Sequence, residues 1–155
     1  IDLDERRMIK KEKELQPFEE AIFQALQFEF EIKKNIIPAH TGGQIEIDLA
    51  IRYGLNFGII EIKEGDAKGA SVTKGIQQLS TAGSRDYLGI FTKKILILGR
   101  AISEINPQYQ KQIRELLHEK RIQVIEVSGW SRDRGRLTKD QADSLRTKLK
   151  EFLAR

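Results

Sequence analysis

The sequence contains no cysteine, so the fold has neither a disulfide framework nor thiolate ligands for zinc. It also has no apolar run that approaches the length of a membrane span, and no signal peptide is visible at its start. We therefore expect a cytoplasmic protein that is indifferent to the redox state of its compartment and has no membrane among its partners.

What is present is ordinary for a soluble globular protein. The chain has 155 residues, of which 39% are hydrophobic and 32% charged, and this length is enough for one domain with a real core. A net charge of +4 is compatible with a polyanionic partner but does not require one. Residues 1–14 carry a run of charges that predicts a helix or a linker from an upstream domain, so the folded domain should span residues 15–155.

The central feature of the sequence is a pair of strands joined by a tight turn. Residues 45–51 alternate between apolar and polar side chains, except that Ala50 takes a polar position, and this is the period of a strand. Residues 57–63 are apolar on both faces until Glu61 and Lys63, as in a strand that is covered on both sides. Gly54 stands at the first central position of the loop, where a type II′ turn needs a positive φ. The segment therefore predicts a β-hairpin.

The position of the two-residue loop fixes which residues of the hairpin face each other. Counting outward from the loop sets Asp48 opposite Glu61 and Glu46 opposite Lys63. The other side then carries only apolar pairs, among them Ile47 with Ile62 and Leu49 with Ile60. Two acids and a lysine thus share one face of a hydrophobic hairpin.

This polar face has two interpretations. Paired carboxylates on neighbouring strands are close enough to bind one cation, and without a cation their like charges destabilise the pair. Oxygen ligands suit Mg²⁺ or Mn²⁺. The alternative is a solvated face on which Glu46 and Lys63 form a cross-strand ion pair and the two acids are only neighbours.

The arrangement of Asp48 and, after a hairpin, Glu61-Ile62-Lys63 resembles the motif of the PD-(D/E)XK nuclease superfamily, which has the restriction-endonuclease-like fold. The flanking pattern is similar to the branch found as effector domains of CRISPR-associated proteins that sense cyclic oligoadenylate. The resemblance implies that Asp48, Glu61 and the Ile62 carbonyl hold Mg²⁺ or Mn²⁺. It also implies that Lys63 orients or deprotonates the attacking water and neutralises the transition state.

The resemblance covers residues 15–127 and departs from the family at Ile47, which replaces the usual proline. It extends to the first helix, where Phe18-Glu19-Glu20 is similar to the start of this helix in the effector branch. Glu19 lies on the apolar side of the expected helix, because it is three and four residues from apolar positions. The family places such a carboxylate beside the metal; the alternative is that Glu19 only borders the apolar stripe and reaches solvent.

The helix expected over residues 72–84 carries a further candidate. The family often has a glutamine near the metal on this helix, and Gln77 lies on a polar side that could look into the site. Which of Gln77 and Gln78 points inward stays open at this stage. Lys68 and Lys74, in the loop and helix that follow the hairpin, are either phosphate contacts or solvated lysines.

A second basic segment lies near the end of the chain, where residues 130–136 read Trp-Ser-Arg-Asp-Arg-Gly-Arg. Arg132, Arg134 and Arg136 could contact a phosphate backbone while the aromatic ring stacks on a base. Exposed basic loops without this function are equally common, so both interpretations stay open.

The remaining patterns complete an α/β architecture. Asn106-Pro107 predicts a capped helix start, and residues 138–141 form a capping box. The further expected elements are strands at 31–37, 94–99 and 122–127 and a first helix from residue 15. The predicted order is α-β-β-β-α-β-α-β-α, a mixed sheet flanked by helices, with parallel pairing where a helix connects two strands.

The function that the resemblance implies is that of an Mg²⁺- or Mn²⁺-dependent endonuclease acting on nucleic acid, with DNA favoured over RNA, within a larger defence protein. One alternative is a Holliday-junction resolvase-like endonuclease, and another is a non-catalytic nucleic-acid-binding domain on the same fold. We also expect a homodimer, because enzymes that cut both strands usually pair two sites and the last helix offers an apolar stripe.

Overall fold

The computed structural model describes residues 16–36, 46–66, 68–82 and 93–155, so the predicted helix or linker over residues 1–14 lies outside the described residues. The elements are α1 (Pro17–Leu26), β1 (Glu31–Ile36), β2 (Ile47–Tyr53), β3 (Asn56–Lys63), α2 (Ala70–Ala82), β4 (Lys93–Leu98), η3 (Ile102–Glu104), α3 (Pro107–Glu119), β5 (Ile122–Glu126) and α4 (Lys139–Ala154). Apart from the short 3-10 turn η3, this is the predicted order of helices and strands.

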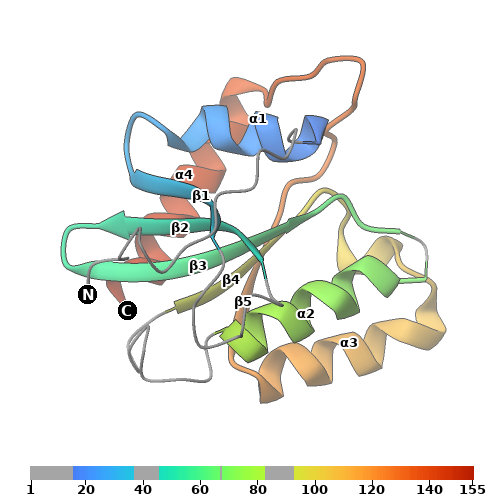
Figure 1. Ribbon diagram of the computed structural model, residues 1–155. Coiled ribbons are helices and arrows are strands. Elements are labelled where there is room, and N and C mark those ends of the chain that lie inside the picture. The colour runs from blue at the N-terminus through green and yellow to red at the C-terminus, as the bar shows by residue number, and fades with distance from the viewer. Residues whose placement is uncertain (1–15, 37–45, 67, 83–92) are drawn as a thin grey trace.

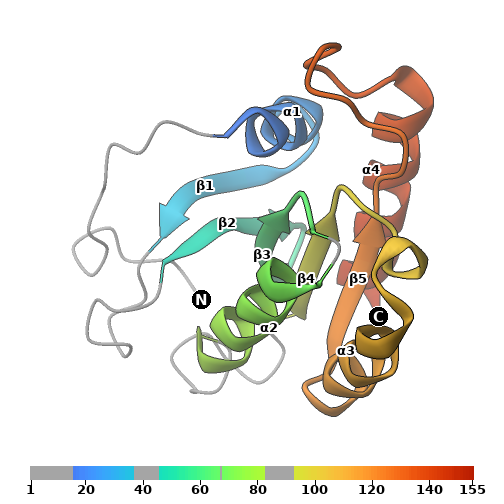
Figure 2. The same ribbon diagram turned by 90° about the vertical axis from the view of Figure 1, so that its right-hand side faces the viewer.

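The strands form one mixed sheet in the order β1-β2-β3-β4-β5. Neighbours among β1, β2 and β3 are antiparallel, whereas β3, β4 and β5 are parallel. Helices α1 and α4 cover one face of the sheet, and α2 and α3 cover the other (Figures 1 and 2). Within the described residues, none of the helices is long and apolar enough to cross a membrane.

The hairpin of β2 and β3 has the predicted register. Tyr53 pairs with Asn56 across the loop, and Leu49 pairs with Ile60 further along the strands. Gly54 begins the loop with φ of +64°, a conformation that side-chain-bearing residues rarely adopt. The turn glycine therefore places the polar residues of both strands on one face, as the sequence indicated.

The two faces of the sheet bury separate apolar clusters, and one predicted pair is not on a common face. Ile62 packs with Leu49 in the cluster under α1 and α4. Ile47 instead packs with Ala50 in the cluster under α2 and α3, so Ile47 and Ile62 do not share the apolar face expected of them. At the same level of the sheet, Asn35 of β1 has φ of +51° and leaves the extended region.

Two helix starts test the predicted caps. At α4 the capping box is present, since the Gln141 N–H donates to the Thr138 hydroxyl at 3.1 Å and the Thr138 N–H donates to the Gln141 side chain at 2.8 Å. At α3 the residue Asn106 occupies the cap position, but its side chain makes no capping hydrogen bond within the described part of the chain. Gln110 instead donates to the Ile105 carbonyl at 2.7 Å.

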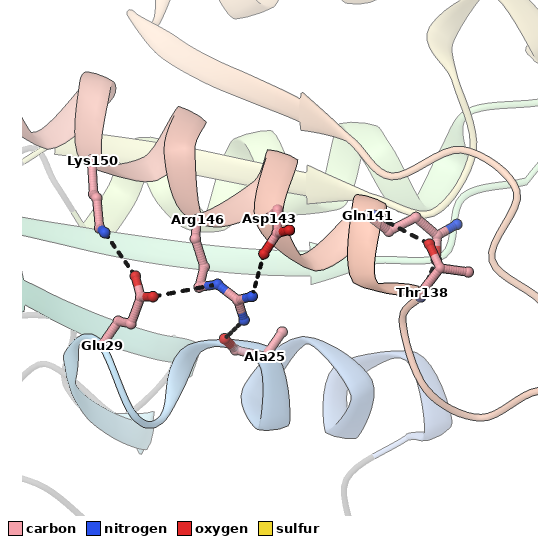
Figure 3. A network of polar contacts seen from close by, with 7 residues as sticks. All are labelled: Ala25, Glu29, Thr138, Gln141, Asp143, Arg146 and Lys150. Carbon is pink, nitrogen blue, oxygen red and sulfur yellow. Dashed lines mark hydrogen bonds and ion pairs between the residues drawn. The ribbon is translucent and has the colours of Figure 1, made fainter.

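Helix α1 is tied to α4 by the guanidinium of Arg146 (Figure 3). Arg146 Nη1 donates to the Ala25 carbonyl at 2.9 Å, and Nη2 donates to Asp143 Oδ1 at 2.7 Å. Glu29 lies 3.7 Å from Arg146 Nε and 2.8 Å from Lys150 Nζ. The network fixes the C-terminal end of α1, and through α1 it helps to position Glu19 near the other end.

We expect Arg146→Ala to lower the free energy of unfolding by about 1–2 kcal/mol, because the Ala25 carbonyl loses a charged donor and the two acids lose their shared cation. Urea unfolding followed by circular dichroism measures the change. Lys148→Ala, an exposed position on the same helix, is the matched control and should change stability by less than about 0.5 kcal/mol. Equal losses in both variants would show that the network contributes nothing specific.

Candidate active site

The site is built on two carboxylates at the end of the hairpin. Asp48 is 8% exposed and Glu61 is 1% exposed, whereas charged side chains are rarely buried to this extent. The described ladder between β2 and β3 ends at the pair Leu49–Ile60. Beyond it the Asp48 N–H donates to Glu61 Oε1 at 3.1 Å, and the Ile62 N–H donates to Asp48 Oδ2 at 2.8 Å. At this end of the hairpin, each carboxylate therefore accepts a hydrogen bond from a backbone N–H of the other strand.

Lys63 lies on the same face of β3 as Glu61. Its Nζ is 3.7 Å from Glu61 Oε2, and its side chain is 21% exposed. Lys63 thus pairs with the acid of its own strand, among the described ion pairs, and the alternative cross-strand pair with Glu46 is not formed. Helix α2 can approach because Gly75 has no side chain: a Cβ there would lie 3.4 Å from Lys63 Cγ and 3.0 Å from Leu96 Cδ1.

Burial raises the pKa of Glu61 to about 9, and the negative charge of Asp48 acts in the same direction. Lys63 and the Asp48 N–H oppose this increase in pKa without cancelling it. A carboxyl group with this pKa is protonated at neutral pH unless a cation is bound beside it. The two acids therefore form a site whose charge is not balanced by the protein alone.

A cavity of about 340 Å³ opens beside Ile62 and Lys63, whereas Asp48 and Glu61 are not among the residues that line it. Its lining comes from the C-terminal end of β3 and the segment after it, the beginnings of α1 and α2, and the loop between β5 and α4. Its lining residues are Gln16, Phe18, Glu19, Ile62, Lys63, Glu64, Gly65, Asp66, Ser71 and Arg132. The cavity thus brings together Glu19, Ile62 and Lys63 of the sequence-predicted site.

Glu19 lies at this cavity, at the start of α1 next to the buried Phe18. The prediction that Glu19 points toward the site rather than away from it is consistent with this position. Among the residues that the structure describes, however, no three His, Cys, Asp or Glu side chains converge closely enough to hold a metal ion. Glu19 therefore shares the cavity with Lys63 but does not form a three-acid group with Asp48 and Glu61.

The structure distinguishes between the two glutamines of α2. Gln77 is exposed, on the same side as the exposed Lys74, and does not reach the site. Gln78 is half-buried, and its Oε1 has no hydrogen-bond partner among the described residues. Because Gln78 is three residues from Gly75, it lies on the helix face that contacts Lys63. Gln78 therefore shares the face of α2 that contacts Lys63, whereas the exposed Gln77 does not, a distinction that the sequence alone left open.

The basic candidates occupy three different places. Lys68 and Lys74 are exposed at the beginning of α2 and do not line the cavity. Arg132 lines it, on the loop between β5 and α4. Arg134 is exposed on the same loop, and Arg136 lines a second cavity of about 410 Å³ together with α1 and the beginning of α4. Only Arg132, among these five, lines the cavity that Lys63 also lines.

Sequence reasoning assigned no role to two acids that line the cavity, Glu64 and Asp66. Asp66 caps α2, since its Oδ1 accepts from the Ala70 N–H at 3.0 Å and its Oδ2 from the Ser71 N–H at 3.2 Å. These bonds, with further backbone donors, lower the pKa of Asp66 although partial burial opposes them. Asp66 stands four residues before the first helical position and not at the N-cap itself, so the usual capping pattern does not reveal it. Glu64 carries no such pattern either.

The mixed five-stranded sheet, with helices on both faces, is a restriction-endonuclease-like α/β fold. Glu61 and Lys63 lie on β3, which pairs with β2 on one side and β4 on the other and so joins the antiparallel and parallel halves of the sheet. Asp48 lies on the neighbouring β2.

Comparison with known proteins agrees with this fold. No family model and no curated protein matches the sequence. Among solved structures, Can2 from Sulfobacillus thermosulfidooxidans, in complex with cyclic tetra-adenylate, is similar with a TM-score of 0.51 and 15% identity, over 88% of this chain and 33% of Can2. A repair endonuclease from Pyrococcus abyssi matches with a TM-score of 0.47 and 15% identity, over 77% of this chain and 50% of that protein. At this level of identity the likeness to Can2 shows the fold alone.

Proposed function

We propose that this chain is a metal-dependent nuclease of the PD-(D/E)XK type that hydrolyses phosphodiester bonds in nucleic acid. The observation that carries the proposal is the buried pair of Asp48 and Glu61 with Lys63 3.7 Å from Glu61, next to an open cavity. A domain that only bound nucleic acid would bind it more tightly without acids that repel phosphate. The presence of two buried acids among apolar residues of the sheet therefore favours catalysis over binding alone.

The residues present fit a hard divalent cation. Asp48 and Glu61 supply carboxylate oxygens, which are the ligands that Mg²⁺ and Mn²⁺ prefer. The raised pKa of Glu61 means that a cation would displace a proton and balance the pair. The Ile62 carbonyl and Glu19 would complete the protein's share of ligands. When bound, the ion would supply an activated water and stabilise negative charge on the phosphate.

Lys63 has the other chemical role in this proposal. Its ammonium group lies at the cavity and close to Glu61, so it can neutralise the charge that develops on the phosphate and orient the attacking water. Glu61 holds Lys63 in place through their ion pair. Gln78, with its open amide oxygen on the adjacent face of α2, is positioned to accept a hydrogen bond from the same water.

Nucleic acid is the proposed substrate, with DNA favoured over RNA. Arg132 is the best-placed phosphate contact, and Lys68, Lys74, Arg134 and Arg136 would contribute at a greater distance from the site. Such contacts position the substrate without reading its sequence. The alternative, a Holliday-junction resolvase-like endonuclease, would use the same groups. Comparing cleavage of a four-way junction with cleavage of a linear duplex distinguishes these two functions.

Cleavage should require Mg²⁺ or Mn²⁺ and stop in EDTA, because the proposed ligands are hard oxygens. The measurement is nicking of supercoiled plasmid and of labelled RNA, with excess metal added back after chelation. Ca²⁺ is the control cation. It also binds oxygen ligands but with a looser geometry, so it should bind the site without supporting full cleavage. Undiminished cleavage in EDTA would contradict the mechanism.

We further propose that the chain acts as the nuclease part of a larger CRISPR-associated defence protein, because it covers 33% of Can2, a structure that contains cyclic tetra-adenylate.

The homodimer remains a proposal as well, but one argument for it no longer holds. The apolar stripe of α4 packs against the sheet of its own chain through Ala142, Leu145, Leu149 and Leu153. A second copy would have to use another surface.

A further inference from the structure

The loop between β5 and α4 reaches back over the cavity and is fixed there at several points. Trp130 packs against Phe18 of α1, with ring centroids 4.9 Å apart and planes tilted by 56°. The Ser128 carbonyl accepts from Gln141 Nε2 at 2.7 Å. At the tip, the Arg134 N–H donates to the Ser131 carbonyl at 3.3 Å and closes a turn around the intervening residues. The loop thus presents Arg132 from a defined position.

Arg132 makes a side-on pair with Glu64, the residue directly after Lys63. Its Nη2 donates to Glu64 Oε1 at 3.0 Å, and its Nε lies 3.4 Å from Glu64 Oε2. Both residues line the cavity that contains Lys63. The planar fork of arginine favours this bidentate geometry, which a lysine cannot form.

The pair has little reason to exist for stability alone. The Arg132 side chain is 65% exposed and that of Glu64 33% exposed, and ion pairs of this exposure contribute little to folding. Glu64 by itself would repel a phosphate from the cavity, so its presence there needs a compensating cation. The pairing uses two of the five N–H groups of the guanidinium and leaves the others for a second anion.

We propose that Glu64 is a positioning residue that holds the Arg132 guanidinium at the mouth of the Lys63 cavity, where Arg132 binds a phosphate of the nucleic acid next to the scissile bond. The inference rests on the proposed function for the identity of the substrate. It assigns to one arginine of the loop a role that Arg134 and Arg136 do not share, because those two lie away from the cavity.

The test is a metal-free binding titration, which does not depend on cleavage. The probes are a short labelled DNA duplex, its single strand and the RNA of the same sequence, each at several salt concentrations. Arg132→Gln should weaken binding about tenfold at low salt and reduce the slope of log K against log salt by about 0.7–0.9, the value of one lost phosphate contact. Arg114→Gln, which removes an exposed charge from α3 outside both cavities, is the matched control and should leave the slope unchanged.

The role of Glu64 is read from a double-mutant cycle. If Glu64 positions the guanidinium, the loss caused by Arg132→Gln should be about threefold smaller in a Glu64→Gln background than in the wild type. Arg132→Lys keeps the charge but not the fork, so it should keep the salt slope and lose the coupling to Glu64. Thermal unfolding of each variant confirms that it is folded.

Several outcomes would overturn the inference. They are binding by Arg132→Gln that equals binding by Arg114→Gln, a loss of affinity that is equal in both backgrounds, and a wild type that binds none of the probes. If the wild type cleaves and Arg132→Gln shows no loss, only this inference fails. If the salt slope and the coupling are as expected but no metal supports cleavage, the binding site stands and the catalytic proposal fails.

Discussion

Replacing Asp48 with alanine is expected to abolish most cleavage, with a loss on the order of 10²–10³ or more, while binding to nucleic acid without metal holds or becomes tighter. The reason is that the variant removes a proposed metal ligand and also one negative charge that repels phosphate. The change leaves the Ile62 N–H without its acceptor at 2.8 Å, so a stability loss of about 1–3 kcal/mol should accompany it. Asp48→Asn, which keeps an acceptor oxygen, should lose cleavage with a smaller loss of stability.

Lys63→Ala provides the opposite probe. It should also lose cleavage by a factor on the order of 10²–10³, but it should weaken metal-free binding, because a cation leaves the phosphate site. Lys111→Ala, whose side chain is 89% exposed on α3, controls for the loss of one positive charge. Nicking assays and binding titrations on the wild type and all four variants measure both effects. Wild-type cleavage by Asp48→Ala, or unchanged binding and cleavage by Lys63→Ala, would contradict the proposed nuclease.

The second large effect concerns Glu61, whose substitution by glutamine should stabilise the metal-free protein. The pKa of Glu61 is raised from 4.5 to about 9 in the folded state, so the folded protein holds a proton that the unfolded chain releases. The contribution of this proton to stability is complete below about pH 4.5 and is lost progressively as the pH rises toward 9. At pH 8 the neutral amide of Glu61→Gln should therefore be more stable than wild type by on the order of 2–3 kcal/mol.

The same variant should be inactive, because an amide is a poor ligand for a divalent cation. Urea unfolding at pH 5 and pH 8 in EDTA measures the stability difference, which should be small at pH 5 and large at pH 8. Glu115→Gln, exposed on α3, controls for the loss of one acidic side chain and should show no such trend. A Glu61→Gln variant that is less stable than wild type at pH 8 would show that the carboxylate is not strained by burial.

The hairpin could be predicted from the sequence because its information is local. Gly54 specifies the turn, and the turn sets the register of the two strands. Counting along that register places Asp48 across from Glu61. The order of helices and strands was predictable for the same reason, from the hydrophobic periodicity of each segment and the glycines and prolines between segments. Glu19 lines the cavity, as the apolar side of its helix suggested, while its part in a metal site stays a prediction.

The orientation of α2 and the positions of the loop arginines could not be predicted from the sequence, because they depend on contacts between distant elements. Gln77 and Gln78 are adjacent in sequence, and only the contact of Gly75 with Lys63 shows which side of α2 faces the sheet. The three arginines of one loop looked equivalent, yet the packing of Trp130 on Phe18 sends Arg132 to one cavity and leaves Arg136 at another. No local pattern in the sequence carries such information, because it arises from segments that are far apart along the chain.

The hydrogen bonds that Asp48 and Glu61 accept have a consequence for how the site would take up a cation. Each carboxylate already satisfies a backbone amide, that of Ile62 and that of Asp48 respectively. An ionised carboxylate has about four acceptor positions, so each acid can keep its backbone donor and still offer lone pairs to a cation. The two amide hydrogen bonds hold both carboxylates in fixed positions on neighbouring strands. A cation that binds there would therefore meet ligands that are already oriented, and little conformational entropy would be lost in ordering them.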